Sequence, residues 1–172
     1  MRLGYDFFHR HALEVAPELV GKVLVHATPE GELRLRLTET ESYCGDAATA
    51  CHAHKGRTRR NEVLYADAGT VYVYLCYGIH HLMNVITGDR DDPQGVLIRA
   101  CEGFPGPGRL TKALGITRAH NRRDMVSDPE IWIEDDGARF EILAAPRVGI
   151  GYASPEDQAR PWRFILGEKI PE

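Results

Sequence analysis

The sequence predicts a fold of the α/β class in its α+β form: a single domain with a mixed, mostly antiparallel curved sheet, peripheral helices and a protruding β-hairpin. Segments with the alternating hydrophobicity of strands outnumber segments with helical periodicity. Strands and helices do not alternate regularly, as they do in parallel sheets. The 172 residues contain no repeat, linker or low-complexity segment, so one domain over residues 1–172 is expected.

The N-terminal part predicts a helix followed by a pair of strands. Residues 5–20 are amphipathic, and Pro17 is expected to break or restart the helix. Residues 21–28 have the composition of a strand, and a Pro-Glu-Gly turn follows them. The alternation in residues 33–43 then predicts the partner strand of a hairpin.

Strand parity assigns a face to the acids in residues 33–43. Leucines at positions 33, 35 and 37 share one face, and a regular strand would continue that face through Glu39, Glu41 and Tyr43. A carboxylate at the end of an apolar stripe is partly desolvated, and the raised pKa that results suits a general base. Two alternatives stay open: both glutamates are solvated, or a bulge breaks the parity.

Residues 71–85 predict two strands joined by a tight turn at Tyr77-Gly78. Aliphatic residues at 71, 73 and 75 form a core face, whereas Tyr72 and Tyr74 lie on the opposite face, where they could contact flat ligands. Tyr77 at the turn is expected to be exposed and placed to act as a wedge. The alternative is a tyrosine-rich strand packed beneath another element.

The second half of the chain predicts further strands and one helix. Residues 95–101 form an apolar run typical of a buried strand, interrupted by Arg99. A buried arginine needs an acidic partner, for which Glu41 and Glu102 are the candidates. A Gly/Pro turn and a short helix are expected over residues 105–115. Three strands complete the expected set: residues 131–134, 140–143 and 162–166.

The composition of the sequence limits the cellular compartments in which the protein is expected. No apolar run approaches the ~20 residues of a membrane span. The first residues lack the apolar segment and cleavage site of a signal peptide. A cytoplasmic protein, or a nuclear one if the source has a nucleus, is therefore expected, with its four cysteines reduced.

The charge distribution gives an ambiguous indication of the partner. The net charge of −4 argues weakly against nucleic acid. Residues 54–60, however, include Lys55 and Arg60 and contain no acid, and a second basic group follows at 118–123. Such runs form either a solvated loop or a surface for phosphates.

Cysteines and histidines cluster near residue 50, at Cys44, Cys51, His52 and His54. Their spacing matches none of the common structural zinc patterns. We therefore expect no metal and no cofactor.

The residue inventory fits an enzyme that acts on a DNA base. Such enzymes flip the base out of the duplex, hold it between aromatic side chains and often fill the gap that is left. Cleavage of an N-glycosidic bond then needs a carboxylate that activates water. The inventory alone does not identify that reaction.

Ordered motifs over nearly the whole chain resemble the alkyladenine, or 3-methyladenine, DNA glycosylase family. They are ETESY (39–43), His52, Arg60-Asn61, GTVYVYLCYG (69–78), Asn84, LIRA (97–100), GPGRLTKALGI (106–116) and RVGIG (147–151). Each motif alone is weak, but the ordered set is specific.

The resemblance implies two catalytic residues. Glu41 would deprotonate the attacking water, and Arg99 would help to hold that water. No lysine lies in the matched catalytic motif, so a monofunctional enzyme that leaves an abasic site is implied, with no Schiff-base step.

The resemblance also implies a binding pocket and a DNA surface. Tyr43, His52 and Tyr74 would sandwich the flipped base, Tyr72 would support the pocket, and Asn84 at its floor would reject guanine. Tyr77 would wedge into the minor groove. The charge of the basic loop, and not the resemblance, predicts that Lys55 and Arg60 contact phosphates. The implied partner is double-stranded DNA with alkylated or deaminated purines, bound by a monomer.

The chain departs from the family pattern in three places. The segment between His52 and Asn61 is one residue short, and Leu75, Cys76, His80 and His81 differ in the hairpin. The long N-terminal extension of vertebrate members is absent, which indicates a bacterial-type protein. These departures leave the substrate range open.

Two rival functions are carried forward. A small-sugar glycosidase would use Glu39 and Glu41 as its carboxylate pair, since residues i and i+2 of a strand lie roughly 6.5–7 Å apart. A non-catalytic nucleic-acid-binding module of the same fold is the other. The first leaves Tyr77 and the basic loop unexplained, and the second leaves Glu41 and Arg99 unexplained.

Overall fold

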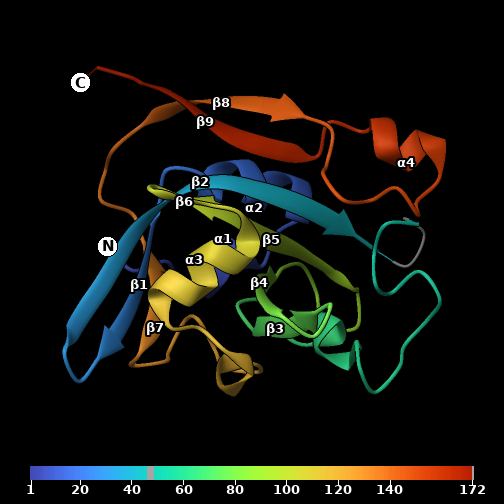
Figure 1. The fold of residues 1–172 in the computed structure, drawn as a ribbon, viewed down its shortest axis with the longest axis horizontal. Helices are drawn as coiled ribbons and strands as arrows, with labels where there is room; N and C mark the ends of the chain where they lie inside the picture. Colours follow the sequence, from blue (N-terminus) through green and yellow to red (C-terminus); the bar gives the residue numbers. More distant parts are fainter. Residues whose placement is uncertain (46–48, 172) are drawn as a thin grey trace.

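A computed structural model describes residues 1–45 and 49–171, arranged around one curled antiparallel sheet (Figure 1). Four helices, two 3-10 turns and nine strands are described. In chain order they are α1 Tyr5–Phe8, α2 Ala12–Leu19, β1 Val23–Thr28, β2 Gly31–Cys44, η1 Glu62–Tyr65, β3 Val71–Cys76, β4 His80–Ile86, β5 Gln94–Cys101, β6 Phe104–Pro105, α3 Pro107–Leu114, η2 Arg118–His120, β7 Ile131–Glu134, β8 Phe140–Ala145, α4 Pro155–Ala159 and β9 Arg163–Lys169.

The sheet has the strand order β3-β4-β5-β2-β1-β7, and β9 joins it on β2 and carries β8. Every ladder between described residues is antiparallel, so the mixed pairing allowed by the sequence reduces to antiparallel pairing. The β8–β9 ribbon runs along the top of the molecule in Figure 1, beside α4. The predicted α+β fold, with its curved antiparallel sheet and peripheral helices, is confirmed.

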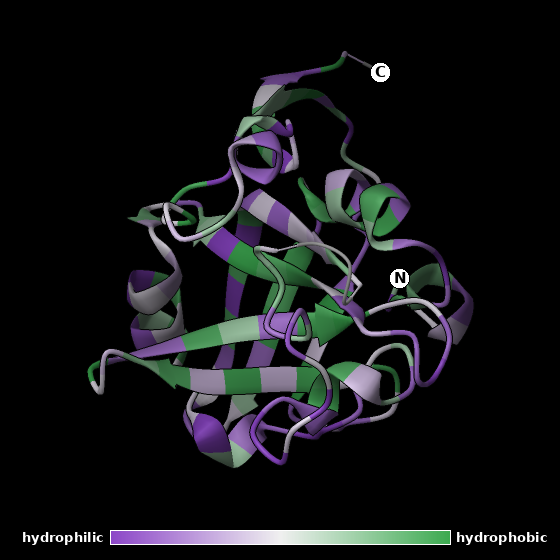
Figure 2. Cartoon of the chain, turned by 90° about the vertical axis from the view of Figure 1, so that its right-hand side faces the viewer, coloured by the Kyte–Doolittle hydropathy of each residue, from purple (hydrophilic) through white to green (hydrophobic). Residues whose placement is uncertain are grey.

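Hydropathy alternates along the strands, as a sheet with one buried face requires (Figure 2). On the helical side, α2 buries Ala12, Val15, Ala16 and Leu19 at the spacing of one helix face, and it packs on β2 and β5. A second helix, α3, packs on β4 and β5 and ends at Gly115, whose φ of 69° requires a left-handed conformation. These contacts fix the middle of the sheet, where β2 carries Glu41 and Tyr43 and β5 carries Arg99.

The break in the N-terminal helical region was predicted at the wrong residue. Pro17 lies inside α2, and the two helices separate at His9 to His11 instead. His11 begins α2 as its N-cap, where its imidazole accepts the Leu13 N–H and Glu14 accepts the His11 N–H. This capping box satisfies backbone donors at the start of the helix and overrides the influence of the proline.

The strand β2 carries a bulge that the predicted parity did not include. Its pairing with β5 shifts register on both sides of Glu39. Leu37 packs in the core, yet Thr40, three residues later, also faces inward and donates to the Ala16 carbonyl. Of the alternatives left open for this strand, the structure has the bulge, which turns Glu39 and Glu41 away from the leucine face that a regular strand would have continued.

The strands β3 and β4 pair from Val71–Val85 to Cys76–His80, as the predicted hairpin requires. Val71 and Val73 are buried in the core. At the turn, Tyr77 and Gly78 have φ angles of 52° and 67°. Two successive left-handed residues are typical of the type I′ turn, whose twist matches that of the two strands.

Among the described residues, no helix combines the length and the apolar character needed to cross a bilayer. The strands predicted from residue 128 onward occur as β7, β8 and β9.

Candidate active site

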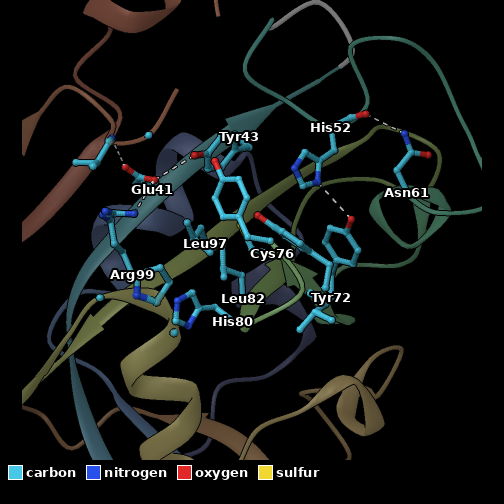
Figure 3. A pocket seen from close by; sticks show the side chains of 18 of the residues that line it. Glu41, Tyr43, His52, Asn61, Tyr72, Cys76, His80, Leu82, Leu97 and Arg99 are labelled. Carbon is cyan, nitrogen blue, oxygen red and sulfur yellow. Dashed lines mark hydrogen bonds and ion pairs between the residues drawn. The ribbon is translucent and has the colours of Figure 1, made fainter. Parts of the chain in front are cut away.

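One pocket of about 900 Å³ opens beside the β3–β4 hairpin, the loop over residues 52–61, the start of α3 and the loop over residues 148–152. Nine of the ten residues predicted for the site line it: Glu41, Tyr43, His52, Lys55, Arg60, Tyr72, Tyr74, Tyr77 and Arg99. The tenth, Asn84, lines a smaller adjoining cavity of about 40 Å³, which it shares with Tyr43, His52 and the two strand tyrosines. Figure 3 shows Glu41 and Arg99 at one side, and His52, Tyr72 and Asn61 at the other.

The Glu41 carboxylate is fully buried but retains hydrogen-bond donors on both oxygens. Oε2 accepts the Val148 N–H at 2.7 Å, and Oε1 accepts the Tyr43 hydroxyl at 3.1 Å. Burial raises the pKa of Glu41, while the Val148 N–H, Arg99, the Tyr43 hydroxyl and Arg147 act in the opposite direction. Glu41 is thus a desolvated carboxylate, which holds a proton more tightly than an exposed one.

Arg99 projects from β5 toward two carboxylates. Its Nη1 lies 3.8 Å from Glu41 Oε1, and its Nε lies 3.5 Å from Glu39 Oε1. Glu41 was one of its two predicted partners. Glu102 was the other, and that prediction was wrong: Glu102 is exposed in the turn after β5, whereas Glu39 comes within reach because of the bulge in β2.

Glu39 has a second arginine partner. Arg163 donates from Nη1 to Glu39 Oε1 at 2.7 Å and from Nε to the Pro146 carbonyl at 2.8 Å. The same carboxylate oxygen therefore faces two arginines, Arg99 and Arg163. The two glutamates share a strand and a face, but their surroundings differ in charge.

The loop after β8 completes the Glu41 end of the pocket. The Arg147 side chain is fully buried and donates to the Ser42 carbonyl, and its guanidinium lies over the rings of Tyr43 and Trp162 at 5.0 and 4.9 Å. This stacking holds the loop against β2, and the next residue, Val148, then presents its N–H to Glu41. Sequence reasoning found the RVGIG motif but gave it no role, because a backbone N–H leaves no signal in the residue type.

The opposite end of the pocket is aromatic. The His52 ring meets the Tyr74 ring edge-on at 4.7 Å, and the Tyr72 and Tyr74 ring centroids lie 5.3 Å apart. Two stacked contacts on a base need about 7 Å between the enclosing rings, so a base does not fit between His52 and Tyr74 as they stand. The two rings form one wall, with His52 Nδ1 3.3 Å from the Tyr72 hydroxyl.

Burial determines the charge state of this wall. It lowers the pKa of His52, with a further contribution from Arg60, and so favours the neutral imidazole. Burial also raises the pKa of Tyr72 to about 12 and the pKa of Tyr74. The wall is uncharged at neutral pH.

Two asparagines organise the backbone around the aromatic wall. Asn61 donates to the carbonyls of His52 and Gly56, and its side-chain oxygen accepts the Thr58 N–H. It thereby holds the loop that carries His52. Asn84 is buried behind the wall and donates to the Tyr72 carbonyl. No role for Asn61 was predicted, although the Arg60-Asn61 pair had been noted as a motif.

The hairpin tip is strongly exposed. Tyr77 is 91% exposed and Ile79 is 71% exposed, which confirms the predicted exposure of Tyr77. In the basic loop, Lys55 and Arg60 line the pocket, whereas Arg57 pairs with Asp91. The second basic group is largely neutralised, because Arg122 and Arg123 pair with neighbouring acids.

One cluster outside the pocket has the composition of a metal site: His26, His120 and Glu130, with candidate ligand atoms within 4.8 Å of one another in the part of the chain that is described. His120 Nδ1 accepts the Thr117 N–H, so the neutral ring carries its proton on Nε2. No lone pair then remains on His120 for a cation. The cluster is better described as a buried histidine pair that links η2 to β1.

The buried Glu41 faces an uncharged aromatic wall across the pocket, and this arrangement fits the class of DNA repair glycosylases, which flip a base out of the duplex and hydrolyse the bond between base and sugar. The particular family follows from comparison with known sequences. The chain belongs to the methylpurine-DNA glycosylase family, whose profile matches residues 6–105 and 102–170.

Individual relatives agree with this assignment and carry the name "Putative 3-methyladenine DNA glycosylase". One from Methanocella arvoryzae is 42% identical over 182 aligned positions, which cover 94% of this chain and 90% of the relative. One from Anaeromyxobacter sp. is 44% identical, covering 96% and 89%. One from Borrelia garinii is 37% identical, covering 93% of both.

Proposed function

We propose that this glycosylase hydrolyses the N-glycosidic bond of alkylated purines such as 3-methyladenine and 7-methylguanine in duplex DNA, leaving an abasic site. Hypoxanthine and ethenoadenine are candidate further substrates. The observation that carries the proposal is that the desolvated Glu41 and the neutral wall of His52 and Tyr74 line the same pocket. The name shared by the relatives supports the choice of methylated purines.

Glu41 acts as the general base in this proposal. Its raised pKa makes it a better proton acceptor than an exposed carboxylate, and its charge stabilises the positive charge that develops on the sugar. Arg99 Nη1 lies 3.8 Å from Glu41 Oε1, beyond a direct hydrogen bond, so the guanidinium is placed to contact a water that approaches Glu41 from the pocket. Arg99 therefore orients the nucleophile while Glu41 removes its proton.

The aromatic wall favours cationic bases. Purines alkylated at N3 or N7 carry positive charge, which is attracted by tyrosine faces. A neutral His52 adds no repulsion, and it can hydrogen-bond to a neutral base. Since the His52 and Tyr74 rings meet edge-on, the base stacks on the face of one of them, and Tyr43 encloses it from another side of the pocket. Asn84, deeper in the protein, limits which exocyclic groups fit.

Duplex binding uses the exposed side of the pocket. Tyr77 occupies the position left by the flipped nucleotide, and Lys55 and Arg60 contact phosphates near it. All three line the same pocket as Glu41, so one protein chain supplies every proposed contact. We therefore propose that the enzyme acts as a monomer.

A panel of duplexes tests the proposal. Each would carry one 3-methyladenine, 7-methylguanine, hypoxanthine or ethenoadenine, and released base would be measured in single turnover. We expect excision of the two methylated purines, with strand cleavage only after hot alkali because the product is an abasic site. The matched control is Glu41→Gln purified in the same way. Absence of methylpurine release by the wild type would overturn the substrate assignment.

A further inference from the structure

Arg163 is not among the residues that line the pocket, yet it contacts two groups next to those that support Glu41: Glu39, which neighbours Arg99, and the Pro146 carbonyl, two residues before Val148. In the ladder between β2 and β9, Arg163 is directly opposite Glu41. Its guanidinium nevertheless reaches diagonally to Glu39 Oε1 at 2.7 Å, and its Nε donates to the Pro146 carbonyl at 2.8 Å. A planar guanidinium suits this task, because it donates in two fixed directions at once.

The first contact acts on Arg99. Glu39 Oε1 accepts from Arg163 and also lies 3.5 Å from Arg99 Nε, while Arg99 Nη1 lies 3.8 Å from Glu41. Arg99 is thus shared between two carboxylates, and Arg163 satisfies one of them. Without Arg163, Glu39 would attract Arg99 more strongly and draw it from Glu41.

The second contact acts on the loop that carries Val148. Ala145 pairs with Arg163 in the β8–β9 ladder, and Pro146, which has no N–H, ends that ladder. The Arg163 side chain binds the Pro146 carbonyl at this point. Two residues later, the Val148 N–H donates to Glu41 Oε2 at 2.7 Å.

We propose that Arg163 is a positioning residue for Glu41, which holds Arg99 through Glu39 and holds the Val148 N–H through the Pro146 carbonyl. The proposal rests on the general-base role of Glu41 proposed above.

The other charged and titratable groups around Glu41 come from several elements. They are Arg99 from β5, Arg147 and Tyr152 from the loop after β8, Tyr43 from β2 and Tyr74 from β3. Of these, Arg99 alone is shown sharing a carboxylate with Arg163.

Two substitutions have opposite expected effects. Arg163→Gln weakens the contacts of Glu41 with Arg99 and with the Val148 N–H, so Glu41 binds its proton more tightly. The acid limb, the part of the pH profile in which the excision rate falls as the pH is lowered, therefore moves to higher pH. Glu39→Gln releases Arg99 toward Glu41 and removes a negative charge near it. Both changes lower the pKa of Glu41, so the acid limb moves to lower pH. A general loss of stability would not produce shifts of opposite sign.

The experiment measures single-turnover release of methylpurines from duplex DNA treated with a methylating agent, across a pH series with enzyme-free blanks. We expect Arg163→Gln to move the acid limb up by about one pH unit. DNA affinity should be unchanged, and the plateau rate should stay within several-fold. Arg160→Gln is the matched control. Arg160 lies over the ring of Trp162, the residue before Arg163, but pairs with Glu156 and Asp157, so the acid limb of this variant should coincide with that of the wild type.

Coincidence of the Arg163→Gln limb with the wild-type limb, or shifts of Arg163→Gln and Glu39→Gln in the same direction, would overturn the inference. If the melting temperature of Arg163→Gln is well below that of the wild type, the test rests on Glu39→Gln. An acid limb of Glu39→Gln that does not move to lower pH then counts against the inference. Glu41→Gln separates this failure from failure of the proposed function: if it excises normally, the base assignment itself is wrong.

Discussion

The surroundings of Glu39 and Glu41 differ although the two residues lie two positions apart on the same face of β2. Glu39 Oε1 meets two arginines and is partly exposed. Glu41 is buried, and its close donors are a backbone N–H and a phenol, with the nearest guanidinium at 3.8 Å. A carboxylate that acts as a base must be oriented without being fully neutralised. Neutral donors meet this requirement for Glu41, the base that we propose, whereas Glu39 is held by two arginines.

Substitution of Glu41 should have the largest effect on excision. Glu41→Gln preserves the shape and the acceptor for the Val148 N–H but removes the base, so excision should fall by about 10²–10⁴-fold. Lesion binding should persist. Single-turnover release and equilibrium binding of the same duplex measure the two effects, and near-normal excision would show that Glu41 is not the base.

Tyr77→Ser changes the molecule at a distance from both carboxylates and so isolates the step of base flipping. Stacking of an aromatic ring on a base is worth roughly 1–3 kcal/mol, which corresponds to about one to two orders of magnitude if flipping limits turnover. Thermal stability should barely change, because Tyr77 is exposed. Excision and melting should be measured together; a large drop in melting temperature would make Tyr77 a core residue instead of a wedge.

The dependence of the wild-type excision rate on pH tests the ionisation state of Glu41. Glu41 must be ionised to act, and burial raises its pKa above the ordinary value of 4.5, so the rate should fall about tenfold per pH unit below a limb that lies above 4.5. His52 should not contribute a second limb near 6.5, because burial lowers its pKa. A rate that stays constant down to pH 4.5 would contradict a desolvated base.

Glu39→Gln should have the smallest effect on the plateau rate, within about threefold of the wild type, because Glu39 does not act on the reacting atoms. The assay belongs at a pH well above the acid limb, where the ionisation of Glu41 is complete. If Glu39→Gln lost excision while Glu41→Gln kept it, Glu39 would be the general base and Glu41 the structural residue. That outcome would also revive the idea of a paired-carboxylate glycosidase.

Much of the fold could be predicted because alternating patterns report directly on strands. The β3–β4 hairpin and α3 follow from residues 71–85 and 105–115 in this way. A bulge was one alternative for residues 33–43, but no residue type specifies its place at Glu39, and the burial of Glu41 was anticipated for the wrong reason. Glu41 is buried where the loop carrying Val148 crosses it, a contact that joins residues 107 positions apart. Local patterns carry no record of such long-range contacts.

The backbone conformation at Tyr77 is one that glycine adopts more easily than tyrosine. A non-glycine residue with a φ of 52° strains its backbone by roughly 1–2 kcal/mol relative to a right-handed conformation, and glycine would relieve that strain. The ring returns little of this cost to the folded protein, because it is almost entirely in solvent. Optimisation for stability alone would therefore remove the tyrosine. A version of this protein redesigned for stability alone would tend to lose the DNA contact that we propose for Tyr77.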